Sequence, residues 1–349
     1  MQIGIDSFVA TTADPITGAK VDPVVRLRNL LEEVETADRL GLDVFGVGEH
    51  HRHEFLDSAP VVLLAAAAAR TKRIRLTSAV TVLSAADPVR VFQEFATLDL
   101  ISGGRAEIVA GRGSFTEAYP LFGLDLRDYD ELFDEKLRLL LEIRDHERIT
   151  WAGKHRPPLQ DQEIHPRPLQ NQLPVWVGVG GSPESVIRAG SLGLPLMIAI
   201  IGGQPDRFRP LVDLYREAGE RSGHSPEKLK VGIHALGSFA ATTKEARDDY
   251  FPGYERMFGQ IGKERGWPSI RRSHFDALCG PGGALVIGDA KEGVKKILHY
   301  NEVLGGIDRM TIQMSPGTLP HGKALIAIRI LGEEVAPAVR KEIGSWSLS

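Results

Sequence analysis

The sequence predicts an α/β protein of the (β/α)8 TIM barrel class with insertions, and three observations carry this prediction. Short apolar runs alternate with amphipathic stretches almost from end to end. The apolar runs are nearly continuous, which is typical of strands buried on both faces of a parallel sheet. Eight strand–helix units can be counted, and eight such units close naturally into a barrel. An open doubly wound sheet is the alternative.

The predicted elements follow one another in a regular order. The strands cover residues 2–8, 43–48, 74–83, 105–110, 174–179, 195–201, 229–239 and 309–314. The predicted helices between and after these strands cover residues 23–40, 59–70, 88–101, 129–145, 183–192, 205–222 and 322–343. Their apolar residues recur at helical spacing, as in a helix that packs one face on a sheet.

Two segments interrupt this order. Residues 147–173 are rich in proline and glutamine, which predicts a small hairpin followed by a loop. Residues 246–288 lie between the seventh and eighth strands and combine aromatic residues, a charged helix and a glycine cluster. An insertion at that place covers the functional end of a barrel and is interpreted as a mobile lid. Neither segment demands a second domain, so residues 1–349 are expected to form one.

Composition excludes several classes of protein. The chain is 42% hydrophobic and 25% charged, as ordinary globular proteins are, and its formal charge of −4 predicts neither a nucleic-acid nor a membrane-surface partner. The single cysteine, Cys279, rules out an internal disulfide and a multi-cysteine zinc site. The longest apolar run, residues 59–69, is far shorter than the ~20 residues of a spanning helix. With no signal-peptide pattern at its start, the protein is expected to be cytoplasmic.

The second strand ends in a glycine- and histidine-rich sequence. Gly46, Gly48 and His50 share one face of this strand. We expect that face to point into the barrel, leaving room for a ligand and aiming His50 at it. A structural histidine at a strand end is one alternative. A metal site with His51 and His53 is another, but no matching ligand set occurs at the other strand ends, and no metal site is predicted.

The third and fourth strands end in small residues and an arginine. Ser78 and Ala79 could let a flat ring approach the backbone, although a tapered barrel strand would look the same. Arg112 stands between Gly111 and Gly113, where a guanidinium suits a phosphate or carboxylate. A surface ion pair is the alternative for Arg112.

The fifth strand runs into a glycine turn and a well-marked helix start. Ser182 is a good N-cap and Pro183 a good first helical residue. Gly178, Gly180 and Gly181 bring backbone N–H groups close to this helix terminus, which predicts a phosphate site. A tight turn without a ligand is the alternative. The chain contains neither a GxGxxG dinucleotide fingerprint nor a GxxxxGK[ST] phosphate loop.

Two further residues carry possible chemistry. His234 lies inside the seventh strand, where histidine serves either packing or acid–base chemistry. Cys279 lies in the second insertion, has no evident activating partner, and is interpreted as inert.

An ordered set of motifs resembles the bacterial luciferase-like flavin monooxygenases. No single motif is diagnostic, but their order is, and the resemblance spans nearly the whole chain, most weakly over residues 246–288. The motifs are Gly48-Glu49-His50-His51, Ser78-Ala79-Val80, Ala86-Asp87-Pro88-Val89-Arg90, Gly104-Arg105, Gly111-Arg112-Gly113, Leu173-Pro174-Val175-Trp176-Val177, Gly193-Leu194-Pro195 and Leu331-Gly332-Glu333-Glu334-Val335-Ala336-Pro337.

The resemblance implies a usually dimeric barrel that holds reduced FMN at its C-terminal face. Position by position, it implies a non-proline cis peptide at Ala79–Val80 beneath the flavin ring, with Gly111 and Glu49 beside the flavin. It places Arg112 and the turn formed by Val179, Gly180, Gly181 and Ser182 around the FMN phosphate. His50 matches the family's catalytic histidine, a general base or hydrogen-bond donor, and His234 keeps a second catalytic position.

Departures from the family narrow the expected activity. Gly111 stands where luciferase has a cysteine beside the ring, which argues against light emission. The desulfonating branch carries Arg-x-His on the seventh strand, and here the triplet reads Gly232-Ile233-His234. The missing arginine argues against an alkanesulfonate substrate.

The expected function is that of an FMN-dependent monooxygenase that uses O2 to oxygenate a small organic substrate. Since no nicotinamide fingerprint is present, a separate flavin reductase is expected to supply the reduced FMN, and a homodimer is expected. A deazaflavin-dependent dehydrogenase or reductase on the same barrel and a non-catalytic flavin-binding protein are the alternatives.

Overall fold

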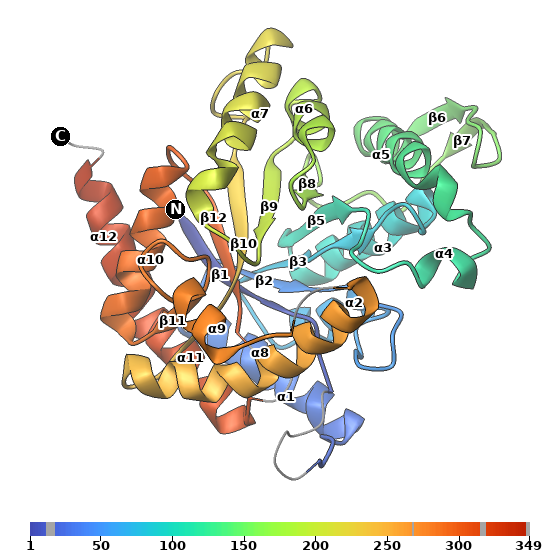
Figure 1. Cartoon of the computed structure of the whole chain (residues 1–349). Coiled ribbons are helices and arrows are strands. Elements are labelled where there is room, and N and C mark those ends of the chain that lie inside the picture. The colour runs from blue at the N-terminus through green and yellow to red at the C-terminus, as the bar shows by residue number, and fades with distance from the viewer. Residues whose placement is uncertain (12–17, 267–268, 315–318, 347–349) are drawn as a thin grey trace.

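The computed structural model describes residues 1–11, 18–266, 269–314 and 319–346. Eight parallel strands form a closed barrel, and each is hydrogen-bonded to the next (Figure 1). The ring closes because the last strand pairs with the first, so the predicted barrel is confirmed and the open sheet is excluded. In order, the strands are β1 (Gln2–Ser7), β2 (Val44–Val47), β3 (Arg75–Ser78), β5 (Ala106–Gly111), β8 (Val175–Val179), β9 (Leu196–Ile200), β10 (Val231–Phe239) and β12 (Arg309–Gln313).

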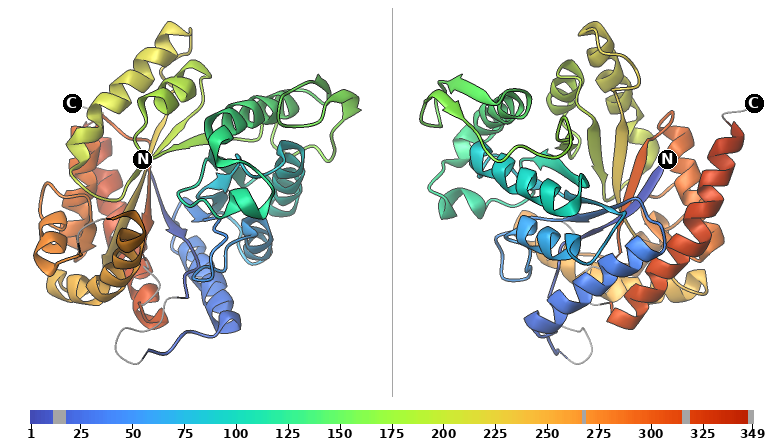
Figure 2. Two further views of the ribbon diagram at one scale, coloured as in Figure 1. Left: turned by 45° about the vertical axis from the view of Figure 1, so that its right-hand side comes forward. Right: turned by 180° about the vertical axis from the view of Figure 1, so that it is seen from behind.

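Helices surround the strands on the outside, as both views in Figure 2 show. The main core lies between the two layers and includes Leu30, Phe45, Phe92 and Tyr300, each at most 1% exposed. Aspartate N-caps start several of these helices, for example Asp87, whose carboxylate accepts the N–H groups of two residues in the first turn. The surrounding helices are α1 (Pro23–Arg39), α2 (Pro60–Ala68), α3 (Pro88–Ser102), α5 (Tyr129–Asp145), α6 (Pro183–Ser191), α7 (Arg209–Arg221), α10 (Ala290–Val303) and α11 (His321–Ile330).

Two predicted helices are not continuous α-helices, and proline explains both. The helix predicted over 205–222 begins as the 3-10 turn η2 (Pro205–Phe208) before α7. The helix predicted over 322–343 passes from α11 through the π-helical segment η3 (Leu331–Val335) into α12 (Ala336–Trp346). Pro210 and Pro337 lack the N–H that a regular α-helix needs at their positions, so the hydrogen-bond pattern changes just before each of them.

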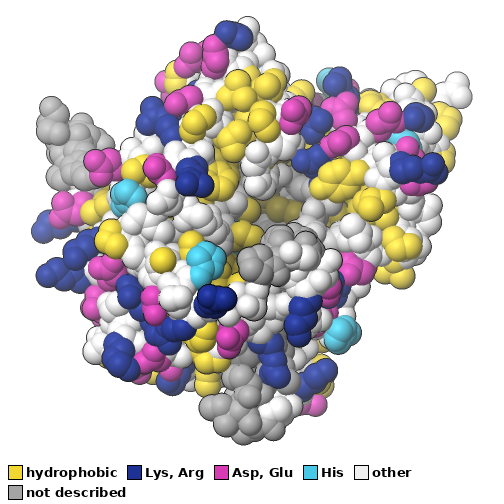
Figure 3. Space-filling model, in the orientation of Figure 1, with side chains coloured by type: hydrophobic (Ala, Val, Ile, Leu, Met, Phe, Trp, Pro, Cys, Tyr) yellow, Lys and Arg dark blue, Asp and Glu magenta, His cyan; other side chains and the backbone are white. Residues whose placement is uncertain are grey.

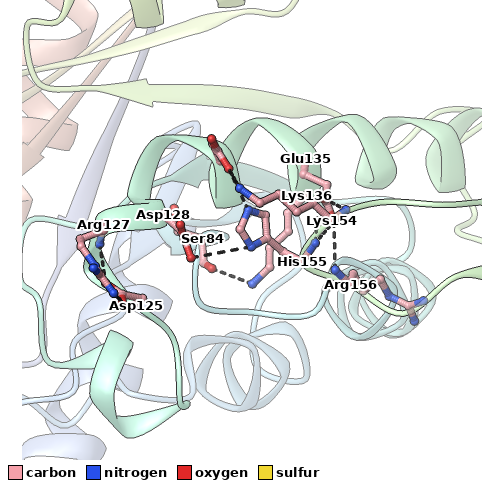
Figure 4. Close-up of polar contacts among 10 residues, drawn as sticks. Ser84, Asp125, Arg127, Asp128, Glu135, Lys136, Lys154, His155 and Arg156 are labelled. Carbon is pink, nitrogen blue, oxygen red and sulfur yellow. Dashed lines mark hydrogen bonds and ion pairs between the residues drawn. The ribbon is translucent and has the colours of Figure 1, made fainter.

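The first insertion forms the predicted hairpin, with β6 (Arg148–Trp151) antiparallel to β7 (Leu159–Glu163). The link between the two strands docks on α5, as Figure 4 shows. The Glu135 carboxylate accepts the backbone N–H groups of Lys154, His155 and Arg156 at 2.7, 3.1 and 3.0 Å. These bonds lower the pKa of Glu135 although its partial burial acts in the opposite direction.

The second insertion contains more regular structure than the sequence predicted. It consists of α8 (Thr243–Arg265), α9 (Arg272–Leu278) and β11 (Val286–Gly288), which extends the sheet beside β10. It has a hydrophobic cluster of its own that includes Tyr250, Tyr254 and Phe275. The predicted boundary at 246 is too late, because Thr242 caps α8 and the helix begins at 243. No helix in the described part of the chain is long and apolar enough to cross a membrane.

Candidate active site

A cavity of about 460 Å³ lies at the C-terminal ends of the barrel strands. The face of the molecule drawn in Figure 3 is hollowed near its centre, in front of the strands, with hydrophobic side chains visible in the hollow. The cavity brings together every site residue expected from the sequence, although these lie as far apart in the chain as 49 and 234. Those residues are Glu49, His50, Ala79, Val80, Gly111, Arg112, Val179, Gly180, Gly181, Ser182 and His234.

A bulge in the sheet forms one wall of the cavity. The strand predicted over 74–83 is interrupted there, because β3 ends at Ser78, a cis peptide bond joins Ala79 to Val80, and the short strand β4 (Thr81–Val82) follows. The cis peptide confirms the geometry that the resemblance implied. Thr77 pairs with Glu107, and Thr81 pairs with Ala110. Between these pairs, residues 78–80 lie opposite only two residues of β5, so the segment contains one extra residue, as in a β-bulge.

The side chain of Ser78 replaces the backbone hydrogen bonds between β3 and β5 that the bulge interrupts. The Ser78 hydroxyl donates to the carbonyl of Val109 at 3.2 Å and accepts its N–H at 3.1 Å. Val80 points over the neighbouring strands, where a Cβ at Gly111 or at Gly178 would lie 2.6 or 2.7 Å from the valine methyl groups. Both glycines are therefore required by the way Val80 packs.

The glycine face of β2 does not leave room for a ligand, and that part of the prediction is wrong. It points into the barrel, but a Cβ at Gly46 would lie 2.1 Å from Oδ1 of Asp6. A Cβ at Gly48 would meet Phe8, Asp57 and His50, all within 2.9 Å. Protein side chains fill the space that these glycines provide.

Glu49 lines the cavity and also holds the bulge. Its Oε2 accepts the N–H of Val82 at 2.8 Å, just after the cis peptide, and its Oε1 lies 3.1 Å from Nε2 of His51. Its side chain is 11% exposed. Glu49 therefore connects the end of β2 to the segment on which a flat ring would lie.

His50 lies in an aromatic environment with one buried carboxylate. The ring centroids of Phe8, Phe55 and Phe115 lie 4.6, 4.4 and 5.5 Å from that of the imidazole. Nδ1 of His50 lies 2.8 Å from Oδ2 of Asp57, a residue that is fully buried. The second ring nitrogen, Nε2, makes no hydrogen bond to another described residue, and His50 lines the cavity.

His234 has a similar arrangement and also contacts Phe8. Its Nδ1 lies 2.6 Å from Oδ2 of Asp6, and its ring stacks on Phe8 with centroids 5.7 Å apart. Thr311 donates its hydroxyl to the same Oδ2. Both histidines thus bond a buried carboxylate through Nδ1.

Arg112 and the start of α6 form a cationic end of the cavity. The Arg112 guanidinium bonds the carboxylate of Asp130 and the hydroxyl of Ser185, the latter at 3.0 Å, and lies over the Tyr129 ring. The Asp130 side chain is 72% exposed, and an ion pair with so exposed a partner contributes little stability. An anion could therefore replace Asp130 at low cost.

The glycine turn beside Arg112 is open. A Cβ at Gly180 or Gly181 would have no neighbour within 4 Å among the described residues, so ligand atoms can approach the backbone here. Ser182 caps α6, accepting the N–H of Ser185 at 3.4 Å. Free N–H groups and the helix dipole at such a terminus favour a phosphate.

The three histidines after β2 do not converge on a common point. His50 pairs with Asp57, His51 with Glu49, and the exposed His53 with Glu54. Among the described residues, the one group with metal-ligating geometry is elsewhere and comprises Asp128, Glu131 and His155. There the carboxylate of Glu131 is bonded to Lys154, and nothing in the described structure indicates an ion.

The second insertion is bonded to the loop that follows β2, where Gln260 of α8 donates to the Glu54 carboxylate at 2.9 Å and Glu264 of α8 pairs with Arg52. Arg52 bonds both carboxylate oxygens of Glu264 in α8, at 3.0 and 2.7 Å, and also Glu54 and Glu117. Its guanidinium lies 4.8 Å from the centroid of Phe115, which in turn contacts His50. The insertion is thus linked to the His50 ring through Arg52 and Phe115, and its interpretation as a mobile lid stays a prediction.

Sequence reasoning missed the carboxylates that hold the two histidines. Asp6 had a usable signal, because it is the charged residue of its strand, Gln2–Ser7. Asp57 had none, since it lies in a loop with ordinary polar composition. Phe8, Tyr129 and Met197 also line the cavity and were not singled out.

Comparisons with known proteins agree with this geometry. Residues 1–305 match the family model for luciferase-like monooxygenases. The chain is 28% identical to 4-hydroxyprotoasukamycin monooxygenase of Streptomyces nodosus subsp. asukaensis, covering 84% of this chain and 82% of that one. It is 27% identical to limonene 1,2-monooxygenase of Rhodococcus erythropolis, covering 90% and 82% of the two chains.

Solved structures share the fold. Monooxygenase RslO1 from Streptomyces bottropensis superposes with a TM-score of 0.83 at 22% identity, over 97% of this chain and 99% of that one. The oxygenating constituent of 3,6-diketocamphane monooxygenase from Pseudomonas putida, in complex with FMN, gives 0.75 at 20% identity, over 97% and 98%. An F420-dependent secondary alcohol dehydrogenase gives 0.76 at 19% identity, over 97% and 99%.

The fold and the site thus define an oxidoreductase on a (β/α)8 barrel. The chain belongs to the luciferase-like monooxygenase family, and it is an oxygen-incorporating oxidoreductase of that class.

Proposed function

We propose that this protein binds reduced FMN and uses O2 to oxygenate a small, largely apolar organic substrate. The observation that carries the proposal is the single cavity in which a cationic end, a glycine-lined wall and two carboxylate-bound histidines meet. Val109, Met197 and Ile201 supply apolar lining beside these polar groups, as small-molecule sites commonly combine the two.

The residues present fit FMN. Arg112, Gly180, Gly181 and Ser182 would hold the phosphate, because the guanidinium and the α6 terminus converge on open space. The bulge at residues 79–80 would support the flavin ring, with Glu49 fixing the segment that follows. When bound, reduced FMN supplies the electrons that activate O2, so that one oxygen atom enters the substrate and the other leaves as water.

The chain's own residues position the reactants and handle protons. The aromatic side chains around His50 exclude water from its ring, which strengthens any hydrogen bond that its free nitrogen makes. His50 would act as the general base or hydrogen-bond donor, and His234 would serve a second acid–base role. A separate flavin reductase would provide the reduced cofactor, and the protein would act as a homodimer.

Oxygen consumption tests the proposal. Mixing the protein with reduced FMN and a panel of alkenes, ketones and thioethers should give substrate-dependent O2 uptake and an oxygenated product that carries one atom of ¹⁸O from ¹⁸O2. His50→Gln should lower the rate by about 100-fold, as expected for loss of a positioned acid–base group. A complete lack of product and of FMN binding would refute the proposal.

A deazaflavin reaction is the second candidate, since F420-dependent proteins share the fold and include a relative 30% identical over 56% of this chain. Reduced F420 would transfer hydride without O2. Binding of F420 with turnover under argon would favour this candidate, and tight binding of FMN alone would exclude it. A protein that binds flavin and yields neither reaction would be the non-catalytic alternative.

A further inference from the structure

Asp57 is a buried carboxylate whose two oxygens both serve His50. It follows β2 by a short loop, and its side chain has no exposed surface. Oδ1 accepts the backbone N–H of His50 at 3.2 Å, and Oδ2 lies 2.8 Å from Nδ1 of the ring. Burial raises the pKa of Asp57, while its bonds to His50 act in the opposite direction.

The three aromatic neighbours of the His50 ring do not compete for its nitrogens. Phe8, Phe55 and Phe115 surround it and offer no hydrogen-bonding atoms on their rings. Gly48 lets Asp57 and His50 approach, because a Cβ at that position would lie 2.8 Å from Oδ2 of Asp57 and 2.9 Å from Cε1 of His50. The local sequence therefore builds the pair between His50 and Asp57 into the fold.

We propose that Asp57 is a positioning residue that keeps the His50 proton on Nδ1 and turns Nε2 to the cavity as the hydrogen-bond acceptor. In a neutral histidine, the partner of one ring nitrogen decides which nitrogen carries the proton. An ionised carboxylate can only accept a hydrogen bond, so it selects the Nδ1–H form. The catalytic consequence of this arrangement rests on the proposed function, but the tautomer itself does not.

His234 and Asp6 provide a matched comparison within the same cavity. Their contact also joins Nδ1 to a carboxylate oxygen, at 2.6 Å. Asp6 differs from Asp57 because its Oδ1 has no hydrogen-bond partner among the described residues. A change at Asp6 therefore perturbs a histidine of the same cavity without touching the partner of His50.

The test is the tautomer of His50 in the cofactor-free protein, measured by long-range ¹H–¹⁵N correlation and assigned by the signals lost in His50→Gln. The wild type should show the Nδ1–H form. Asp57→Asn should switch it to Nε2–H, because the new amide keeps its carbonyl on the His50 backbone N–H and turns its NH2 to Nδ1. Asp6→Asn should leave the His50 tautomer unchanged.

Two results would overturn the proposal in this experiment. One is an Nε2–H form in the wild type, which would mean that Asp57 is protonated and donates to the ring. The other is an Asp57→Asn variant that unfolds thermally like the wild type, and is therefore folded, but keeps the wild-type tautomer of His50. Because the wild-type spectrum alone decides the first point, a variant that fails to fold does not prevent the test.

Kinetics separate this proposal from the proposed function. If the wild type oxygenates a substrate, Asp57→Asn should lower kcat by about 100-fold, with KM and the Kd for FMN within about 2-fold of the wild type. Full kcat in a variant whose tautomer has switched would overturn the positioning role. If the wild type shows no oxygenation at all, the proposed function fails, while the tautomer measurement still decides the role of Asp57.

Discussion

Single glycines at the rim of this barrel make room for neighbouring side chains. Gly46 accommodates Asp6, Gly48 accommodates the pair of His50 and Asp57, and Gly111 accommodates Val80. Since packed interiors do not tolerate even one additional methyl group without displacement, each glycine fixes the position of a residue that lines the cavity. The glycine at position 111 therefore has a packing reason.

Gly111→Ala should destabilise the protein by about 1–3 kcal/mol, because the new Cβ would lie 2.6 Å from Val80. Adding Val80→Ala should restore most of the lost free energy, since it removes the atoms that collide. Urea unfolding measures both effects. Gly180→Ala is the control for stability, because its Cβ would have no neighbour within 4 Å among the described residues. Additive losses in the double variant would contradict this account.

Arg112→Ala should weaken binding of FMN by about 10- to 100-fold and leave riboflavin binding unchanged, because only FMN carries the phosphate. Asp130→Asn should leave FMN binding the same or tighter, since it removes the exposed carboxylate that competes for the guanidinium. Fluorescence titration measures the dissociation constants of FMN and riboflavin for the wild type and Arg112→Ala, and that of FMN for Asp130→Asn. Equal losses for FMN and riboflavin would show that Arg112 does not hold the phosphate.

At the scale of elements, a buried lysine joins the second insertion to the barrel. Lys296 of α10 is 2% exposed and donates to the carbonyls of Gly280 and Gly283, which close the turn before β11. Burial lowers the pKa of Lys296 to about 8. This contact connects α10 to the glycine-containing turn between α9 and β11.

The contribution of Lys296 to the stability of the folded protein should therefore rise with pH between about 8 and 10.5. In that window the unfolded chain keeps the Lys296 proton that the folded protein has lost, so raising the pH favours folding, by at most about 1.4 kcal/mol per pH unit. Lys296→Met should remove this slope from urea-unfolding free energies. Lys295→Met, a change at an exposed neighbour, should keep it, and identical slopes in the two variants would refute the role of Lys296.

At the scale of the whole molecule, a buried ionic cluster fills the barrel beneath the cavity. Arg309 on β12 is 1% exposed, bonds Glu107 on β5 at 2.6 Å and Gln2 on β1 at 2.9 and 2.7 Å, and lies over the Trp176 ring on β8. Arg75 on β3 bonds the second oxygen of Glu107. The cluster thus joins strands from both halves of the chain across the inside of the barrel.

Arg309→Ala should cost about 3–5 kcal/mol of unfolding free energy, because it removes one of the two cations that compensate the buried Glu107 carboxylate. Arg75→Ala should cost less, since the Arg75 side chain is 26% exposed and Arg309 would remain. Chemical denaturation of both variants measures the difference. A loss at Arg75 as large as that at Arg309 would contradict the ranking.

The expected homodimer also belongs to this scale. A groove of about 530 Å³ between α2 and α3 is lined by apolar side chains, among them Val62, 68% exposed, and Ile101, 54% exposed. We expect this groove to lie in the dimer interface. Replacing Val62 and Ile101 by glutamate should then convert the expected dimer to a monomer, as measured by light scattering, because a charge in a buried interface is costly. Leu121→Glu, outside this groove, is the control. A wild-type monomer would refute the expectation.

Much of the fold was predictable because each strand and helix carries its own local pattern. Strands β1, β2, β5, β8, β9, β10 and β12 were all predicted within a few residues of their observed bounds. Errors fell at prolines inside helices, at the bulge after β3 and at β11, where local propensity does not report the hydrogen-bond partner. The helix α10 was also missed, because no element was predicted over residues 290–303.

The sequence by itself determined the barrel and the set of residues at its rim. This was sufficient because parallel strands of a closed barrel bring their C-terminal ends to one side, so motifs that end strands must gather there. Only the tertiary structure decided which side chains meet. The contact between His234 and Asp6 spans 228 residues, and the place of Val80 over Gly111 and Gly178 depends on strand register and an extra residue in one strand. Such contacts are set by distances across the barrel, and no local pattern in the chain encodes them.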